Sequence, residues 1–81
     1  MKIYDYHGKK NVSGDRIREA RLKRRLTQED LAAKLQIEGV IMERDSVSRM
    51  EIGTRFVTDY ESMVLSKVLG VSTQWLVGLE E

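Results

Sequence analysis

Residues 27–55, TQEDLAAKLQIEGVIMERDSVSRMEIGTR, indicate two short helices joined by a connector. Thr27 is suited to cap the first helix, and Asp30 three residues later completes a variant of the reciprocal capping box. An apolar stripe follows, as in a helix that packs one face against a core: Leu31, Ala32 and Leu35. Gly39 is the natural end of this helix.

The second helix lies within RDSVSRMEIG, residues 44–53, where Val47 and Met50 form an apolar pair three residues apart. Gly53 marks its end. The polar side chains that point elsewhere are Arg44, Asp45, Ser48 and Arg49. Guanidiniums, a carboxylate and a hydroxyl are suited to reading base edges in a DNA major groove. From the charge pattern alone, a solvated helix face explains them equally well.

Length and composition favour one small all-helical domain. Eighty-one residues without proline suffice for a single core and are too few for a separate sensing or catalytic domain. No apolar run approaches the roughly 20 residues that span a membrane, and the absence of cysteine is compatible with a reducing cytoplasm, where we expect the protein to act. His7 is the only histidine, so we expect no metal site, no cofactor and no catalysis.

The charge is polarised along the chain although the net charge is only +1. Residues 1–34 hold ten Lys and Arg against five Asp and Glu, which gives +5, and residues 35–81 hold four against eight, which gives −4. Such a division can leave a basic face for phosphates. Helices with charged outer faces are the other interpretation.

The N-terminal segment before the two helices divides at about residue 13. Residues 1–12 lack a clear period, and we expect a flexible arm followed by a single domain, residues 13–81. The arm's lysines, Lys2, Lys9 and Lys10, have two interpretations, a basic arm that reaches around DNA or a solvated tail. A first helix should run from Gly14 to Arg24 or Arg25, with Ser13 as its cap. Its apolar side is predicted to be Ile17, Ala20 and Leu22.

Two further helices are predicted after residue 57. Thr58 and Glu61 form a capping box of the full T-x-x-E type, so a fourth helix should cover residues 59–69 and stop at Gly70. Its core side should hold Leu65, Val68 and Leu69, with Tyr60 and Met63 half-buried. Ser72 should cap a last short helix that lays Trp75 and Leu76 on the bundle.

Three motifs occur in order between residues 16 and 78: RIREARLKRRLTQEDLAAKL, then VSRMEIG, then VLGVSTQWLVG. This part of the chain resembles the helix-turn-helix domain of phage repressors of the Cro and lambda-repressor type, in the xenobiotic-response-element group. The resemblance implies a lambda-repressor-like compact bundle of four to five short helices whose third helix enters the major groove. It also implies that Arg21 pairs with Glu51; the alternative is a snorkelling arginine beside a capping glutamate.

The connector between the second and third helices departs from the family pattern. Gln36 stands where most relatives have a glycine. When Val47 is aligned with the usual apolar position of the third helix, the connector has about five extra residues. We therefore expect a second helix lengthened to about Glu38, then Gly39 and a short loop, and a third helix that starts near Glu43. The loop residues 40–42 should either tuck under the core or form a partner contact.

These features predict a sequence-specific transcriptional regulator that occupies a double-stranded DNA operator. The base-reading candidates are Arg44, Asp45, Ser48 and Arg49, and the phosphate-binding candidates are Gln28, Thr54 and Arg55. Arg55 could instead lie in a narrow minor groove. Because a helix of about nine residues reads too few base pairs, we expect a homodimer on DNA, with a contact near residues 75–79. The rival is an antitoxin-like protein-interaction module, which requires an apolar patch around residues 40–42 and Trp75.

Overall fold

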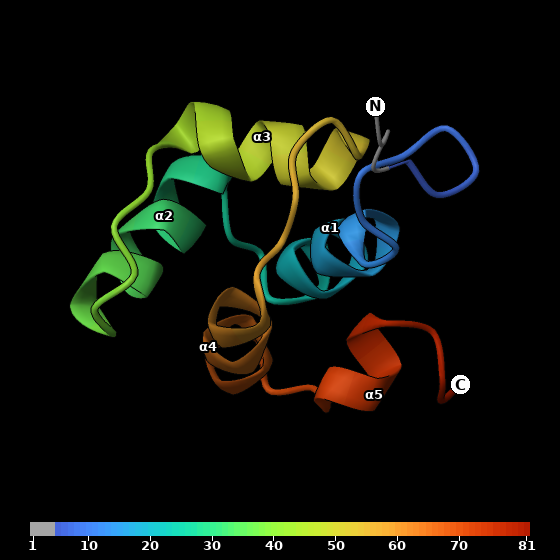
Figure 1. Ribbon diagram of the computed structural model, residues 1–81. Coiled ribbons are helices and arrows are strands. Elements are labelled where there is room, and N and C mark those ends of the chain that lie inside the picture. Colours follow the sequence, from blue (N-terminus) through green and yellow to red (C-terminus); the bar gives the residue numbers. More distant parts are fainter. Residues whose placement is uncertain (1–4) are drawn as a thin grey trace.

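The computed structural model describes residues 5–81, which fold into five helices around one core (Figure 1). The helices are α1 (Gly14–Lys23), α2 (Gln28–Ile37), α3 (Arg44–Ile52), α4 (Asp59–Leu69) and α5 (Thr73–Leu76). Among the described residues there is no strand, and the only β contact is an isolated bridge between Tyr6 and Lys9. The predicted all-α class is therefore confirmed.

One apolar core joins all five helices. Each helix contributes at least one fully buried side chain, among them Ile17, Leu31, Leu35, Val47, Met50, Leu65, Leu69 and Leu76. α1 packs against α3, α4 and α5, while α2 packs against α3 and α4. α3 is thus supported from behind by two helices.

Local capping signals place the helix ends. The predicted capping boxes are both present, since Thr27 Oγ1 accepts from the Asp30 N–H and Thr58 Oγ1 accepts from the Glu61 N–H. Gly53 and Gly70 close α3 and α4 with φ values of +91° and +69°, the left-handed conformation that glycine adopts without a steric penalty. The start of α1 differs from the prediction, because Ser13 occupies the cap position without a side-chain cap hydrogen bond.

The predicted connector is confirmed in outline. α2 ends at Ile37 with Glu38 as its cap, and α3 begins at Arg44 after Glu43. The loop between them divides by side chain: Val40 and Met42 belong to the core, whereas Ile41 is 75% exposed. The expected tuck under the core therefore holds for two of the three loop residues.

Three apolar side chains lie outside the positions predicted for them. Leu22, predicted on the core side of α1, is exposed because the buried stripe continues from Ile17 through Ala20 to Arg21. Tyr60 and Met63, predicted to be half-buried, are also exposed. The buried stripe of α4 follows residues 61, 65 and 69, and residues 60 and 63 fall on the opposite side of the helix.

Residues 5–10 form a tight turn, here called the N-terminal hairpin. Tyr6 and Lys9 exchange two backbone hydrogen bonds of 2.7 and 3.0 Å. The two residues between them, His7 and Gly8, both have positive φ, +52° and +82°, as in the turns that best match strand twist. Lys2, also assigned to the arm, lies outside the described residues. The domain boundary at residue 13 stays a prediction.

Candidate nucleic-acid interface

α3 has one buried side and one exposed polar side. Val47 and Met50 are fully buried, which confirms the predicted apolar pair. Of the predicted base-reading residues, Arg44, Asp45 and Arg49 are exposed and Ser48 is half-buried. The structure thus brings these four side chains onto one helix. The Arg44 and Asp45 side chains approach to only 3.8 Å and are largely in water, so their ion pair is weak.

Arg21 and Glu51 bind α3 to α1, as the resemblance implied. The guanidinium donates from Nε to Oε2 at 2.6 Å and from Nη2 to Oε1 at 2.9 Å, and the two residues are only 7% and 5% exposed. Arg21 Nη1 also donates to the Leu26 carbonyl at 2.8 Å. The hydrogen bond to Glu51 raises the pKa of Arg21, and the two-pronged contact fixes the position of α3 against α1.

Gln28, the first residue of α2, points toward this ion pair. Its Nε2 donates to Glu51 Oε1 at 3.1 Å, and the side chain is half-buried. The amide predicted to hold a phosphate is thus already a partner of Glu51. The backbone N–H groups at the start of α2 are the other donors that this position offers to an anion.

Arg55 is engaged within the protein. Its guanidinium makes a two-pronged contact with Glu61 at 2.9 and 3.0 Å, and Nη1 also donates to the Phe56 carbonyl. This hydrogen bond to Glu61 raises the pKa of Arg55. Burial, the largest single influence on Glu61, raises its pKa, but the Arg55 and Thr58 hydrogen bonds outweigh burial and the pKa lies below its usual value. Thr54 remains exposed at the end of α3.

Asn11 is a site residue that sequence reasoning missed. Its Oδ1 accepts from the N–H groups of Ser13 and Gly14, at 3.1 and 2.8 Å, so Asn11 rather than Ser13 satisfies the first donors of α1. Its Nδ2 donates to the carbonyls of Met50 and Arg55, at 3.0 and 2.8 Å. The first pair is a local asparagine-turn pattern that the sequence could have revealed. The second depends on tertiary structure.

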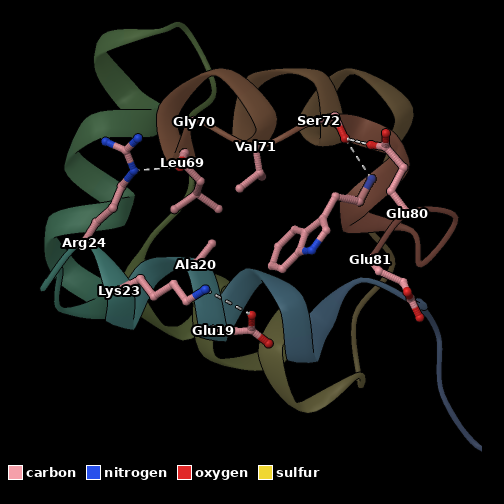
Figure 2. A pocket seen from close by; sticks show the side chains of 11 residues that line it. Glu19, Ala20, Lys23, Arg24, Leu69, Gly70, Val71, Ser72, Glu80 and Glu81 are labelled. Atoms are coloured by element: carbon pink, nitrogen blue, oxygen red, sulfur yellow. Dashed lines mark hydrogen bonds and ion pairs between the residues drawn. The ribbon is translucent and has the colours of Figure 1, made fainter.

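A groove free of α3 residues lies between α1 and the α4–α5 segment (Figure 2). Several of its charged and polar side chains bind one another or the backbone. Arg24 Nε donates to the Leu69 carbonyl, Lys23 lies 3.8 Å from Glu19, and Ser72 contacts Glu80 and caps α5 (Figure 2). These contacts indicate a structural role.

Neither a metal-binding cluster nor a membrane-spanning helix occurs in the described part of the chain. Within residues 5–81, no group of three or more His, Cys, Asp or Glu side chains is placed to hold a metal ion. No helix in this range is both long and apolar enough to cross a membrane.

Comparison with models of known protein families identifies the family of this chain. A model of the family described as "Helix-turn-helix" matches residues 17–76, which include all five helices except the first turn of α1. No curated protein matches the chain. Members of the matching family are in general DNA-binding regulators, and they are typically not enzymes. The match covers more than half of the chain, and the protein therefore belongs to the helix-turn-helix family of the Cro/C1 type.

Proposed function

We propose that the protein is a sequence-specific transcriptional regulator of the xenobiotic-response-element group, and that it inserts α3 into the major groove of an operator. Bound there, it regulates transcription by blocking or assisting polymerase. Phosphate contacts supply most of the affinity, and α3 supplies the sequence preference.

The observation that carries this proposal is the contrast between the two sides of α3. One side is held by fully buried Val47 and Met50 and by the desolvated pair of Glu51 with Arg21. The other side presents a short row of hydrogen-bonding groups to solvent. Because α3 is already fixed in the free protein, little conformational entropy is lost when it enters a groove, and this favours specific recognition.

Each residue has a role in this proposal. Arg44, in the first turn of α3, reads a guanine through a two-pronged contact. Asp45 and Ser48 contact neighbouring bases, and Arg49 contacts a neighbouring base or a phosphate. The start of α2 at Gln28 and the exposed Thr54 hold the DNA backbone. We infer that Arg55 acts mainly by fixing the loop after α3, since its guanidinium is paired with Glu61.

Selection of bound sites from random duplexes, followed by affinity titrations at several salt concentrations, tests the function. We expect a preferred sequence, and a binding constant for that sequence that falls with salt. Equal affinity for selected and scrambled duplexes would overturn sequence-specific recognition. Absence of any salt-dependent binding would overturn DNA binding itself.

The structure gives little support to the rival function as a protein-interaction module. That function requires an apolar surface from Val40 to Met42 together with Trp75. Val40 and Met42 are buried, and Trp75 is half-buried with the Arg16 guanidinium 4.7 Å from its ring. Only Ile41 of the predicted patch is largely exposed, so DNA binding remains the proposal.

A further inference from the structure

The N-terminal hairpin is attached to the C-terminal end of α3. The Lys10 N–H donates to the Gly53 carbonyl at 2.8 Å, and the adjoining Asn11 binds the carbonyls of Met50 and Arg55. Lys9 lies across Gly53 so closely that an added Cβ would approach Lys9 Cδ to 2.8 Å. The hairpin therefore has a fixed position relative to the proposed recognition helix.

This attachment changes the electrostatics at the end of α3. The last carbonyls of a helix carry partial negative charge, which repels a phosphate. Here three carbonyls in this region, those of Met50, Gly53 and Arg55, receive donors from the N-terminal segment, and the Lys9 side chain lies against Gly53. Lys10 Nζ lies 5.4 Å from the centre of the Phe56 ring, so this ammonium is held near the same end. An anion meets cations there instead of bare carbonyl oxygens.

The hairpin also lies on the same side of the molecule as α3, while α4 and α5 lie on the other side (Figure 1). When a recognition helix meets bases with its N-terminal end, its C-terminal end lies toward the edge of the groove, where the sugar–phosphate backbone runs. Groups attached to that end are therefore placed to meet phosphates.

The turn itself exposes two aromatic side chains, those of Tyr6 and His7. His7 is one of two non-glycine residues among residues 5–81 with positive φ, and Tyr6 is 61% exposed. Their rings form an edge-to-face pair with centres 4.4 Å apart. A non-glycine residue in the left-handed region is uncommon, and such residues are frequent at binding sites.

We propose that the N-terminal hairpin is a second DNA contact, in which Lys9 binds a backbone phosphate beside the base pairs that α3 reads. Lys10 supports this contact electrostatically from its place over Phe56. This inference rests on the proposed function. It gives the N-terminal segment, expected from the sequence to be a flexible arm, a fixed contact with DNA. It adds affinity for any sequence and little preference among sequences.

The decisive variant is Lys9→Gln, which keeps the Cβ and Cγ methylenes over Gly53 and removes the charge. Binding to the selected operator and to a scrambled duplex is measured by fluorescence anisotropy between 0.05 and about 0.3 M salt. For one lost phosphate contact per protomer, the magnitude of the log–log salt slope should fall by about 0.9 for each bound protomer, and affinity near 0.1 M salt by about eightfold for each. Both duplexes should lose affinity equally.

Two matched variants complete the experiment. Lys9→Arg keeps a cation and should retain the wild-type slope, whereas Lys23→Gln removes an exposed charge from α1 beside the groove of Figure 2 and should leave the slope unchanged. Equal effects of Lys9→Gln and Lys23→Gln would show a general charge effect and overturn the hairpin contact. An unchanged slope in Lys9→Gln, with Arg44→Ala still losing specificity, would overturn the hairpin contact and leave the proposed function intact.

A spectroscopic measurement gives an independent result. Titration of operator into isotope-labelled protein should shift the amide resonances of Gly8 and Lys9 together with those of α3. Shifts confined to α3 would contradict the proposal. If no resonance shifts with any duplex, the proposed function fails as well.

Discussion

Two polar side chains, Arg21 and Asn11, hold α3 in place through hydrogen bonds. Within the described residues, every fully buried side-chain nitrogen and oxygen has a hydrogen-bond partner. Such networks add modest stability while complete, but removing one member leaves its partner buried and unsatisfied, at a cost of several kcal/mol for a charge. Both residues should therefore be sensitive to small chemical changes.

Breaking the ion pair from one side should be more harmful than removing it altogether. Arg21→Met or Glu51→Gln should each lower the free energy of unfolding by about 3–5 kcal/mol, because the surviving charge stays desolvated. The double variant should lose less than the sum of the two. Urea unfolding of all three variants measures the coupling; additive losses below 1 kcal/mol in each single variant would contradict the buried pair.

Asn11→Asp should destabilise the protein although the two side chains have nearly the same shape. The carboxylate can still accept from Ser13 and Gly14, but it cannot donate to the carbonyls of Met50 and Arg55. We expect a loss of about 1–3 kcal/mol in urea unfolding, together with weaker DNA binding. Gln36→Glu on the exposed side of α2 is the matched amide-to-acid control and should change little. Equal stability of both variants would show that these donations contribute nothing.

Glu61 should make stability depend on acidity. Its pKa in the folded protein lies below the usual value of about 4.5, so the unfolded chain binds the proton more readily. The contribution of ionised Glu61 to the free energy of unfolding is complete above about pH 5 and is lost as pH falls through the folded-state pKa. Glu61→Gln should flatten the decline of the melting temperature below pH 4.5, while Glu29→Gln, on exposed α2 surface, should not. Asp30, whose pKa is also lowered by its Thr27 hydrogen bonds, keeps part of the decline in both.

At the scale of helices, local chemistry was enough to predict most boundaries. Thr27 and Thr58 each have an acidic partner three residues later, and both helices start where these boxes predict. Leu22, Tyr60 and Met63 were misplaced because a hydrophobic side chain does not by itself define the buried side. Arg21 and Glu61, both charged, take positions on the buried stripes instead.

From the residues alone, the candidate site was predictable only in its local part, whereas the pairing of Arg21 with Glu51 followed from the family resemblance. That α3 exposes Arg44 and Arg49 follows from the spacing of Val47 and Met50 within one helix. The partners of Gln28 and Arg55 do not follow from any local pattern, because Glu51 and Glu61 reach them only in the folded chain. The place of Asn11 between α1 and α3 was beyond the sequence for the same reason.

Two arginine variants should separate base recognition from sequence-independent DNA binding. Arg44→Ala should cost about 1–3 kcal/mol on the preferred site and relax the preference at one base pair, with stability unchanged because this side chain is mostly in water. Arg55→Ala should weaken binding to all sequences alike and also destabilise the fold, since it leaves buried Glu61 without its cation. Competition binding and thermal melts of both variants distinguish the effects. Uniform weakening by both would show that α3 is not the reader.

At the scale of the whole molecule, a single α3 is too short to read a long DNA site. The described part measures 37 × 28 × 19 Å, and nine-residue α3 spans only about 13 Å of groove. A genome offers so many competing sites that a single helix lacks sufficient discrimination. We therefore propose that two copies bind together.

The operator should be an inverted repeat whose half-site centres lie about 34 Å apart, one turn of DNA. Footprinting should show two symmetric protected segments, and insertion of five base pairs between them should abolish paired binding. The proposed contact near residues 75–79 includes exposed Leu79, so Leu79→Lys should weaken the full site more than an isolated half-site. Tight binding of one copy to a single half-site would contradict the dimer.

The bonds of Asn11 also have a consequence for the order of events during synthesis. Asn11 and the Arg55 carbonyl that it binds are 44 residues apart in the chain. At translation rates of about 5–20 residues per second, the ribosome adds Arg55 roughly 2–9 s after Asn11. During that interval the residues of α3 and the following loop that contact α1 and the hairpin are not yet synthesised. Both segments therefore depend on local contacts alone. The nascent chain can therefore assemble its proposed DNA-binding surface only after the loop beyond α3 has emerged.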